Sequence, residues 1–143
     1  MPDYLATFRT RLLHAEALVE LARGQQRLAD AGDYDGLIDS LGRKQRIIER
    51  MAAGCDDLTR REWVADRDFI ESPLREECDA LLERAERCLD ETLTLERDTI
   101  TQVTAARDRV TADLNRLTAT RQTGTGYAEQ DTSPQRSLLD LSR

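Results

Sequence analysis

The sequence has few of the side chains that build metal centres. Its 143 residues include one histidine and three cysteines, and no two of the cysteines form a Cys-x-x-Cys pair. A structural zinc site takes about four such ligands, and the Glu-x-x-His pairs of di-iron helical bundles are missing as well. We therefore expect no metal site, and we expect His14 to be an ordinary residue of the surface or of a helix contact.

The cysteines do not suggest a disulfide framework. Their number is odd, and Cys78 and Cys88 are ten residues apart in one predicted helix. That spacing is a rise of about 15 Å, which excludes a disulfide between them within one chain. We expect all three, Cys55 included, to be reduced and to pack as small apolar residues.

Aromatic residues and long apolar runs are also scarce. Aromatic side chains make up 4% of the chain and charged ones 34%, so it cannot build a thick globular core. One domain of layered helices, with narrow contacts of leucine, alanine and valine, suits this composition. No apolar run approaches the roughly 20 residues that span a bilayer, and the N-terminal stretch, with Asp3, is not a secretory signal. The sequence therefore predicts a cytoplasmic protein without membrane insertion.

Charge and motifs argue against two further classes of protein. The formal charge is −7, whereas binding to nucleic acid needs a basic face. No nucleophile stands beside a base, and the Gly124-x-Gly126 pair lacks the strand and the third glycine of a nucleotide loop. We expect neither a nucleic-acid partner nor an enzyme.

What the sequence does have is helical periodicity, above all between Leu74 and Arg121, a stretch without glycine or proline. Ser72 can cap its start, and Pro73 suits the first helical position. At about 1.5 Å per residue this helix, 73–121, would be some 70 Å long. Its apolar residues form two stripes, which predict two neighbouring helices. One stripe is Leu74, Cys78, Leu81, Ala85 and Cys88, and the other is Leu82, Leu89, Leu93, Ile100, Val103, Val110, Leu114 and Leu117.

The preceding residues predict three shorter helices, at about 3–31, 34–52 and 56–71. A turn from Gly32 to Gly36 makes the first two an antiparallel hairpin, with Leu41 at a buried contact. The third carries Trp63 and Phe69, which we expect to close the end of the core, in preference to a role as an aromatic anchor for a partner. The predicted fold is all-α: an elongated helical bundle over residues 1–122 with coiled-coil-like packing. A flexible tail, 123–143, follows and contains at most a short helix.

The run from Leu12 to Met51 resembles the front half of the bacterial flagellar type III export chaperones of the FlgN and FliT kind. The resemblance is carried by a long helix, a glycine-aspartate turn, two leucines, a Lys-Gln pair and an aliphatic pair. In this sequence these are Gly32-Asp33, Leu37, Leu41, Lys44-Gln45 and Ile47-Ile48. The family also has a long C-terminal helix followed by a tyrosine-containing joint, where this chain has Tyr127. The glycine that usually follows that tyrosine is replaced by Ala128.

The resemblance implies a small cytoplasmic chaperone that uses no cofactor and catalyses nothing. Such a protein binds a helical segment of a late export substrate, a hook-filament junction or filament-cap protein. It then delivers the substrate to the export gate or to the export ATPase components. In this family layout Tyr127 would serve the contact with the export gate.

The sequence also suggests where a substrate would bind. The shorter helices, of about 30 and 20 residues, cannot cover both stripes along the whole long helix. An uncovered apolar stripe usually marks an interaction site. We therefore predict the substrate-protein-binding surface at Ile100, Val103, Val110, Leu114 and Leu117.

Two alternatives remain open on the sequence. The same stripe could be an outer wall against another helix or a second copy. The protein would then be a structural or adaptor coiled coil, with self-association as one form of it, and a monomer and a homodimer are both compatible with the pattern.

Overall fold

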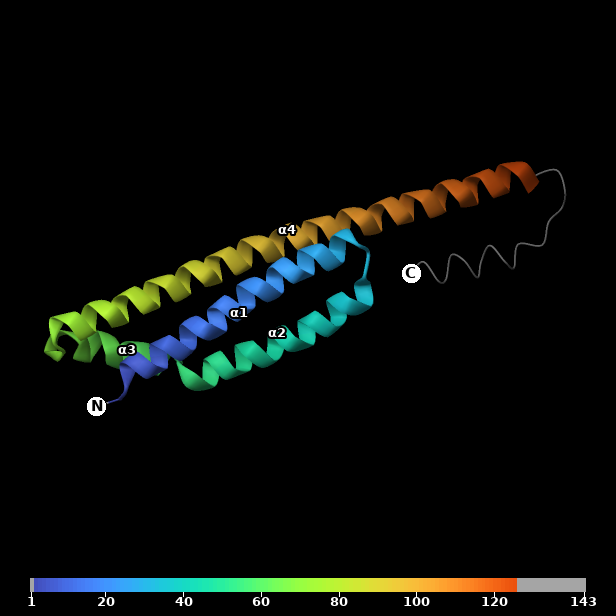
Figure 1. The fold of residues 1–143 in the computed structure, drawn as a ribbon. Helices are drawn as coiled ribbons and strands as arrows, with labels where there is room; N and C mark the ends of the chain where they lie inside the picture. Colours follow the sequence, from blue (N-terminus) through green and yellow to red (C-terminus); the bar gives the residue numbers. More distant parts are fainter. Residues whose placement is uncertain (1, 126–143) are drawn as a thin grey trace. The chain divides into compact units, whose positions relative to one another are not determined.

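The computed structural model describes residues 2–125, which are helical apart from short connections (Figure 1). This confirms the predicted all-α fold. The elements in chain order are α1 (Tyr4–Asp30), α2 (Tyr34–Gly54), α3 (Asp57–Asp66), the 3-10 helix η1 (Arg67–Phe69) and α4 (Ser72–Thr125). Within residues 2–125 no helix is both long enough and apolar enough to cross a membrane.

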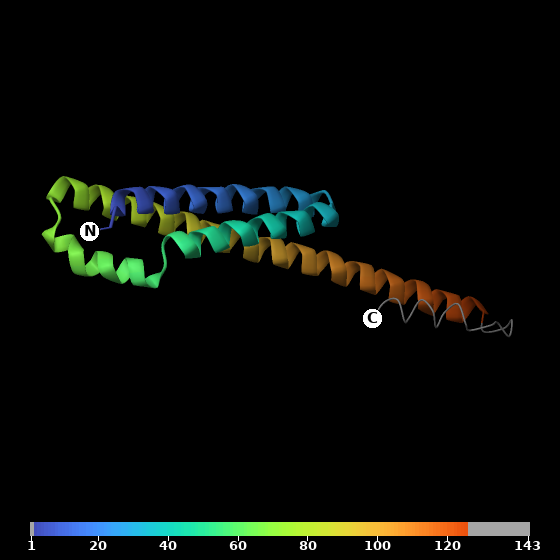
Figure 2. The same cartoon turned by 90° about the horizontal axis from the view of Figure 1, so that it is seen from below.

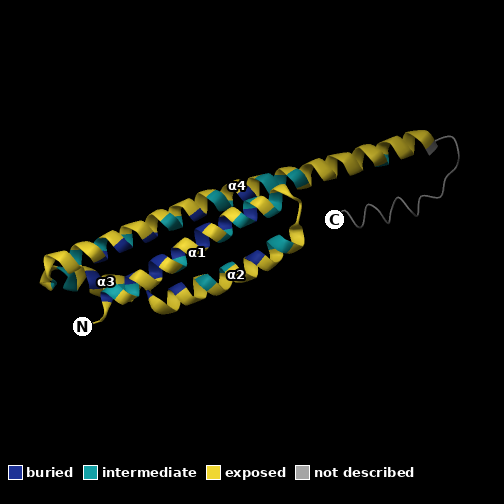
Figure 3. Cartoon of the chain, viewed as in Figure 1, coloured by how far each residue is buried: buried dark blue, intermediate teal, exposed yellow. Residues whose placement is uncertain are grey.

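The chain divides into two compact units, Met1–Ile100 and Thr101–Arg143, and α4 runs through both. The buried residues of α4 stop at Thr99, and none of residues 101–124 is buried. Figure 3 shows this as an almost unbroken exposed surface over the last part of α4. The predicted extent of the bundle, residues 1–122, stays a prediction.

Aspartate side chains start the first three helices. Asp3, Asp33 and Asp56 each accept a hydrogen bond from a backbone N–H in the first turn of α1, α2 and α3. Between α1 and α2 the chain reverses at Gly32, whose φ of 69° lies in the left-handed region that glycine adopts without strain. The predicted turn is therefore present, and α1 and α2 lie side by side and antiparallel (Figures 1 and 2).

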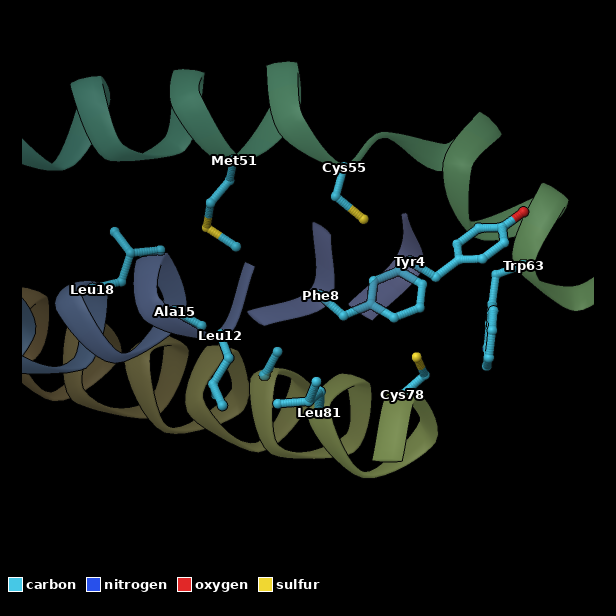
Figure 4. Packing of buried hydrophobic residues seen from close by; sticks show 11 residues of the cluster. Tyr4, Phe8, Leu12, Ala15, Leu18, Met51, Cys55, Trp63, Cys78 and Leu81 are labelled. Carbon is cyan, nitrogen blue, oxygen red and sulfur yellow. The ribbon is translucent and has the colours of Figure 1, made fainter. Parts of the chain in front are cut away.

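Helix α1 supplies the centre of the core of the first unit. Its buried apolar residues recur every three or four positions, so one face of the helix is buried from Tyr4 to Ala22. Residues of the other helices point toward this face (Figure 4). The core cluster consists of Tyr4, Phe8, Leu12, Ala15, Leu18, Met51, Cys55, Trp63, Cys78, Leu81 and Ala85.

An aromatic cluster closes the end of this core. The ring of Trp63 lies 5.0 Å from that of Tyr4 and 5.3 Å from that of Phe8, both with edge-to-face geometry. The indole N–H of Trp63 donates to Asp79, and the Tyr4 hydroxyl donates to Asp66. The prediction that Trp63 belongs to the core is thus confirmed.

The same prediction is wrong for Phe69, which is 85% exposed. Helix α3 ends at Asp66, and the chain continues as the 3-10 helix η1. Phe69 is six residues after Trp63, and at about 100° per residue that spacing already takes it roughly 120° away from the face that carries Trp63.

Leu41 also differs from its prediction, because it is 53% exposed where a buried contact was expected. The buried residues of α2 are Ser40 and Met51. The apolar face of α2 is broader than the part that α1 covers, and Leu41 lies on the uncovered part. The helix prediction was right and the assignment of its inner face was wrong.

Some polar side chains inside the bundle have partners in their own helix or in a neighbouring helix. The hydroxyls of buried Thr92 and Thr99 donate to the backbone carbonyls of Cys88 and Leu95, four residues earlier in α4. Ion pairs also join α4 to α1 and α2. They include Arg9 with Glu77 (2.9 Å), Arg23 with Glu91 (2.7 Å) and Lys44 with Glu96.

Candidate functional site

An apolar groove lies between α2 and α4 in the first unit. Its volume is about 530 Å³, and α1 contributes to its lining. The residues that line it are Arg11, Leu18, Lys44, Ile48, Met51, Ala52, Cys55, Leu89, Thr92, Leu93 and Glu96. We call it the α2/α4 groove. Ile48 on one wall is 38% exposed and Leu93 on the other is 50% exposed, so the groove is open to solvent.

The charged groups of the α2/α4 groove stand at its two ends. At one end Lys44 of α2 forms an ion pair with Glu96 of α4. At the other end the Arg11 guanidinium lies near Glu86, with a distance of 3.4 Å from Nη2 to Oε1. The walls between these ends are formed mostly by aliphatic side chains, so the middle of the groove favours an apolar occupant.

Exposed apolar residues continue from the groove along both walls. On α2, Tyr34 and Leu41 precede Ile48 at intervals of seven residues, and both are about half exposed. On α4, Ile100 follows Leu93 at the same interval and is 65% exposed. A seven-residue apolar repeat is the pattern with which helices pack against one another in coiled coils.

The structure divides the predicted substrate-binding residues between the two units. Ile100 belongs to the first unit, where it continues the α4 wall. The other four lie in the second unit, and we call them the C-terminal stripe: Val103, Val110, Leu114 and Leu117. Three of them are exposed, by 59% for Val110, 42% for Leu114 and 60% for Leu117, whereas Val103 is partly buried. Their role in binding stays a prediction, and Tyr127 lies outside the described residues.

Sequence inspection missed Ile48 and Leu41 as surface residues of the site and did not single out Leu93. The width of the apolar face of α2 could have indicated this surface, because the face carries more aliphatic residues than one neighbouring helix covers. The sequence assigned the whole face to the core. The structure shows that one edge of it forms a groove wall.

The sequence pattern did not indicate that Arg11 is buried. It is 8% exposed, on the buried face of α1. Besides the α2/α4 groove it lines a second cavity, of about 260 Å³, between α1 and the end of α2. His14 lines this second cavity too and is partly buried, as expected of a residue at a helix contact.

The cysteines are free thiols, with Cys55 and Cys78 buried and Cys88 partly buried. Burial is the largest cause that raises the pKa of each thiol. A raised pKa keeps a thiol protonated and poorly nucleophilic, so these cysteines act as packing residues. Within residues 2–125 no group of three or more histidine, cysteine, aspartate or glutamate side chains is placed to hold a metal ion.

Comparisons of the chain with protein-family models, with curated proteins and with solved structures find no match.

Proposed function

We propose that this protein is a chaperone that captures a helix of another protein in the α2/α4 groove. The groove itself carries the proposal, because its aliphatic walls are exposed and enclose an apolar space of about 530 Å³ between two helices. Exposed, contiguous apolar surface on a folded protein marks an interaction site. Contact of this apolar surface with water is unfavourable, and an apolar partner that covers it would remove that cost.

A helix is the occupant that fits this surface. Helices α1, α2 and α4 form three sides of a bundle, and a fourth helix, about 10 Å across, would complete it. Apolar residues three, four and seven positions apart on that helix would meet the repeats of Leu41 and Ile48 on α2 and of Leu93 and Ile100 on α4. A small molecule fits less well, since typical pockets enclose most of the ligand.

The flagellar part of the proposal is that the captured helix belongs to a late type III export substrate. It rests on the resemblance of residues 12–51, whose features fall on α1, on the turn at Gly32 and on α2. The substrate would be a hook-filament junction or filament-cap protein, passed on to the export gate or the export ATPase components.

The C-terminal stripe supports a second candidate function, self-association as a coiled coil. Val103, Val110 and Leu117 recur at intervals of seven residues, and Leu114 lies between the last two at helical spacing. Such a repeat on an exposed helix can pack against the same repeat in a second copy. It is also the substrate-binding surface that the sequence predicted.

Paired charge substitutions separate these functions. The test variant carries Ile48→Asp and Leu93→Asp on the two groove walls, and its matched control carries Val110→Asp and Leu117→Asp on the C-terminal stripe. Binding of the terminal helix of a hook-filament junction protein is measured by calorimetry, and oligomeric state by sedimentation. We expect the groove variant to bind roughly tenfold more weakly or worse, with the control unchanged.

The opposite result would place the substrate on the C-terminal stripe. A control variant that changes only the oligomeric state would instead favour the self-associating coiled coil. Circular dichroism of both variants establishes that they remain helical.

A further inference from the structure

Arg11 is a buried cation at one end of the α2/α4 groove. Its side chain is 9% exposed, and its neighbours on the same face of α1 include Phe8, Leu12 and Ala15, all buried and apolar. An apolar residue at this position would match the rest of the face. The guanidinium is therefore a costly choice for packing alone, because a buried charge needs a partner.

The partner that Arg11 has is a weak one. Its Nη2 lies 3.4 Å from Oε1 of Glu86, whereas charge-assisted hydrogen bonds are about 2.7–2.9 Å long. The same Oε1 lies 3.6 Å from Nη1 of Arg60, so one oxygen of the half-exposed Glu86 side chain serves two arginines at long range. The Nε atom of Arg11 is fully buried and has no hydrogen-bond partner.

Cys55 lines both cavities together with Arg11 but does not supply a negative charge. Burial raises the pKa of the Cys55 thiol, although the Arg11 guanidinium opposes that shift. Cys55 is then a neutral thiol, and the guanidinium keeps unused capacity to bind an anion.

We infer that the helix captured in the α2/α4 groove carries a carboxylate that binds Arg11. This inference rests on the proposed function and narrows its partner to one class: an amphipathic helix whose apolar face is interrupted by one aspartate or glutamate. The apolar residues of that helix cover Ile48 and Leu93 while the carboxylate meets Arg11 at the end of the groove. A fork of guanidinium donors matches the two oxygens of a carboxylate.

Arg11 then sets both selectivity and register. An entirely apolar helix would cover the guanidinium and remove it from water without giving it a new partner. A lysine at the same place would repel it. Among helices of similar hydrophobicity, the groove selects one with an acid at the position that reaches Arg11.

The test uses designed amphipathic peptides with the full-length protein. In one set, glutamate replaces each residue of the apolar face in turn; matched sets carry glutamine or leucine at the same positions. We expect one glutamate peptide to bind wild-type protein roughly tenfold more tightly than its glutamine counterpart. The variant Arg11→Met keeps most of the side-chain volume and removes the charge. With this variant the preference for glutamate over glutamine should disappear.

A second measurement keeps the test independent of any stability change. The side-chain Nε–H resonance of Arg11 should shift on addition of the preferred glutamate peptide and stay in place with its glutamine counterpart. Arg11→Lys, which retains charge but not the fork, should keep part of the preference.

The outcomes separate the two proposals. If the leucine or glutamine peptides bind wild-type protein as tightly as every glutamate peptide, the groove captures helices but the inference about Arg11 is overturned. An equal glutamate preference in wild-type protein and Arg11→Met overturns it too. If no peptide binds and the Ile48 and Leu93 substitutions have no effect on substrate capture, the groove proposal itself fails.

Discussion

The two parts of α4 use similar residues in different ways. In the first unit the helix buries Cys78, Leu81 and Ala85 against other helices. In the second unit Leu114 and Leu117 recur at comparable spacing yet remain exposed. A helical apolar stripe therefore identifies a face of the helix, but it does not reveal whether another helix covers that face.

The charged residues of α4 differ in the same manner. In the first unit Glu77 and Glu91 form ion pairs with arginines of α1. The ion pairs described for residues 101–124 are local, such as Arg116 with Asp113. Local pairs add only a few tenths of a kilocalorie per mole to one helix, whereas the exposed pairs of the first unit add a similarly small energy to contacts between helices.

The strongest way to break the first unit is to remove a ring from its centre. Phe8 is 0% exposed and packs against Trp63. Phe8→Ala should lower the free energy of unfolding by about 3–5 kcal/mol, measured by urea denaturation. A loss below about 1 kcal/mol would show that the aromatic cluster is not a fixed part of the core.

A matched pair of leucines in α4 tests the comparison directly. Leu81 is 9% exposed and Leu117 is 60% exposed. Leu81→Ala should cost about 2–5 kcal/mol of unfolding free energy, whereas Leu117→Ala should cost about 0.5 kcal/mol or less. Equal costs would mean that Leu117 is covered in solution, and sedimentation would then show whether a second copy covers it.

The hydroxyl of Tyr4 gives the first unit a pH dependence. Burial, followed by the hydrogen bond to Asp66, raises the pKa of Tyr4 to about 12. The unfolded value is about 10, so the folded state holds this proton more tightly and stability falls as pH rises from about 10 to about 12. Below about pH 10 the contribution is complete.

Tyr4→Phe isolates this effect, because the other tyrosines and the cysteines titrate equally in both proteins. The difference in unfolding free energy between wild type and Tyr4→Phe should shrink across that interval. A constant difference would show that Tyr4 titrates normally.

The smallest effect on stability is expected in the second unit. The double substitution Val103→Asp and Val110→Asp should change the unfolding free energy of the first unit by less than about 0.5 kcal/mol. Far-ultraviolet circular dichroism should show that helicity is retained. If the protein unfolds, these valines are core residues and the C-terminal stripe is not a free surface.

The sequence predicted the larger features of the fold because they depend on local chemistry. The turn at Gly32 needs a residue that adopts the left-handed backbone conformation, and Ser72 and Pro73 mark the start of the long helix. Trp63 was also placed correctly, since a single large aromatic in a small helical protein is usually needed by the core.

The misplaced residues depend on how helices cover one another. Leu41 lies on the apolar face of α2, yet its exposure is decided by the position of α1 and α4. Phe69 is exposed at the end of the 3-10 helix η1, six residues after Trp63 and therefore on another face. Arg11 is a charged residue in an apolar face, and a pattern of apolar positions cannot reveal that it is buried. The groove was therefore not predictable from periodicity.

The single tryptophan makes the first unit optically distinct. Trp63 is buried beside Tyr4 and Phe8, and the sequence from Thr101 to Thr125 contains neither tryptophan nor tyrosine. Its fluorescence emission therefore reports the solvent environment of the first unit alone. Far-ultraviolet circular dichroism instead reports the total helix content, which includes both parts of α4. On heating, loss of ellipticity before the emission shifts to the red would show that the exposed end of α4 frays while the core is intact. Coincident changes would show that the whole helix melts as one cooperative segment.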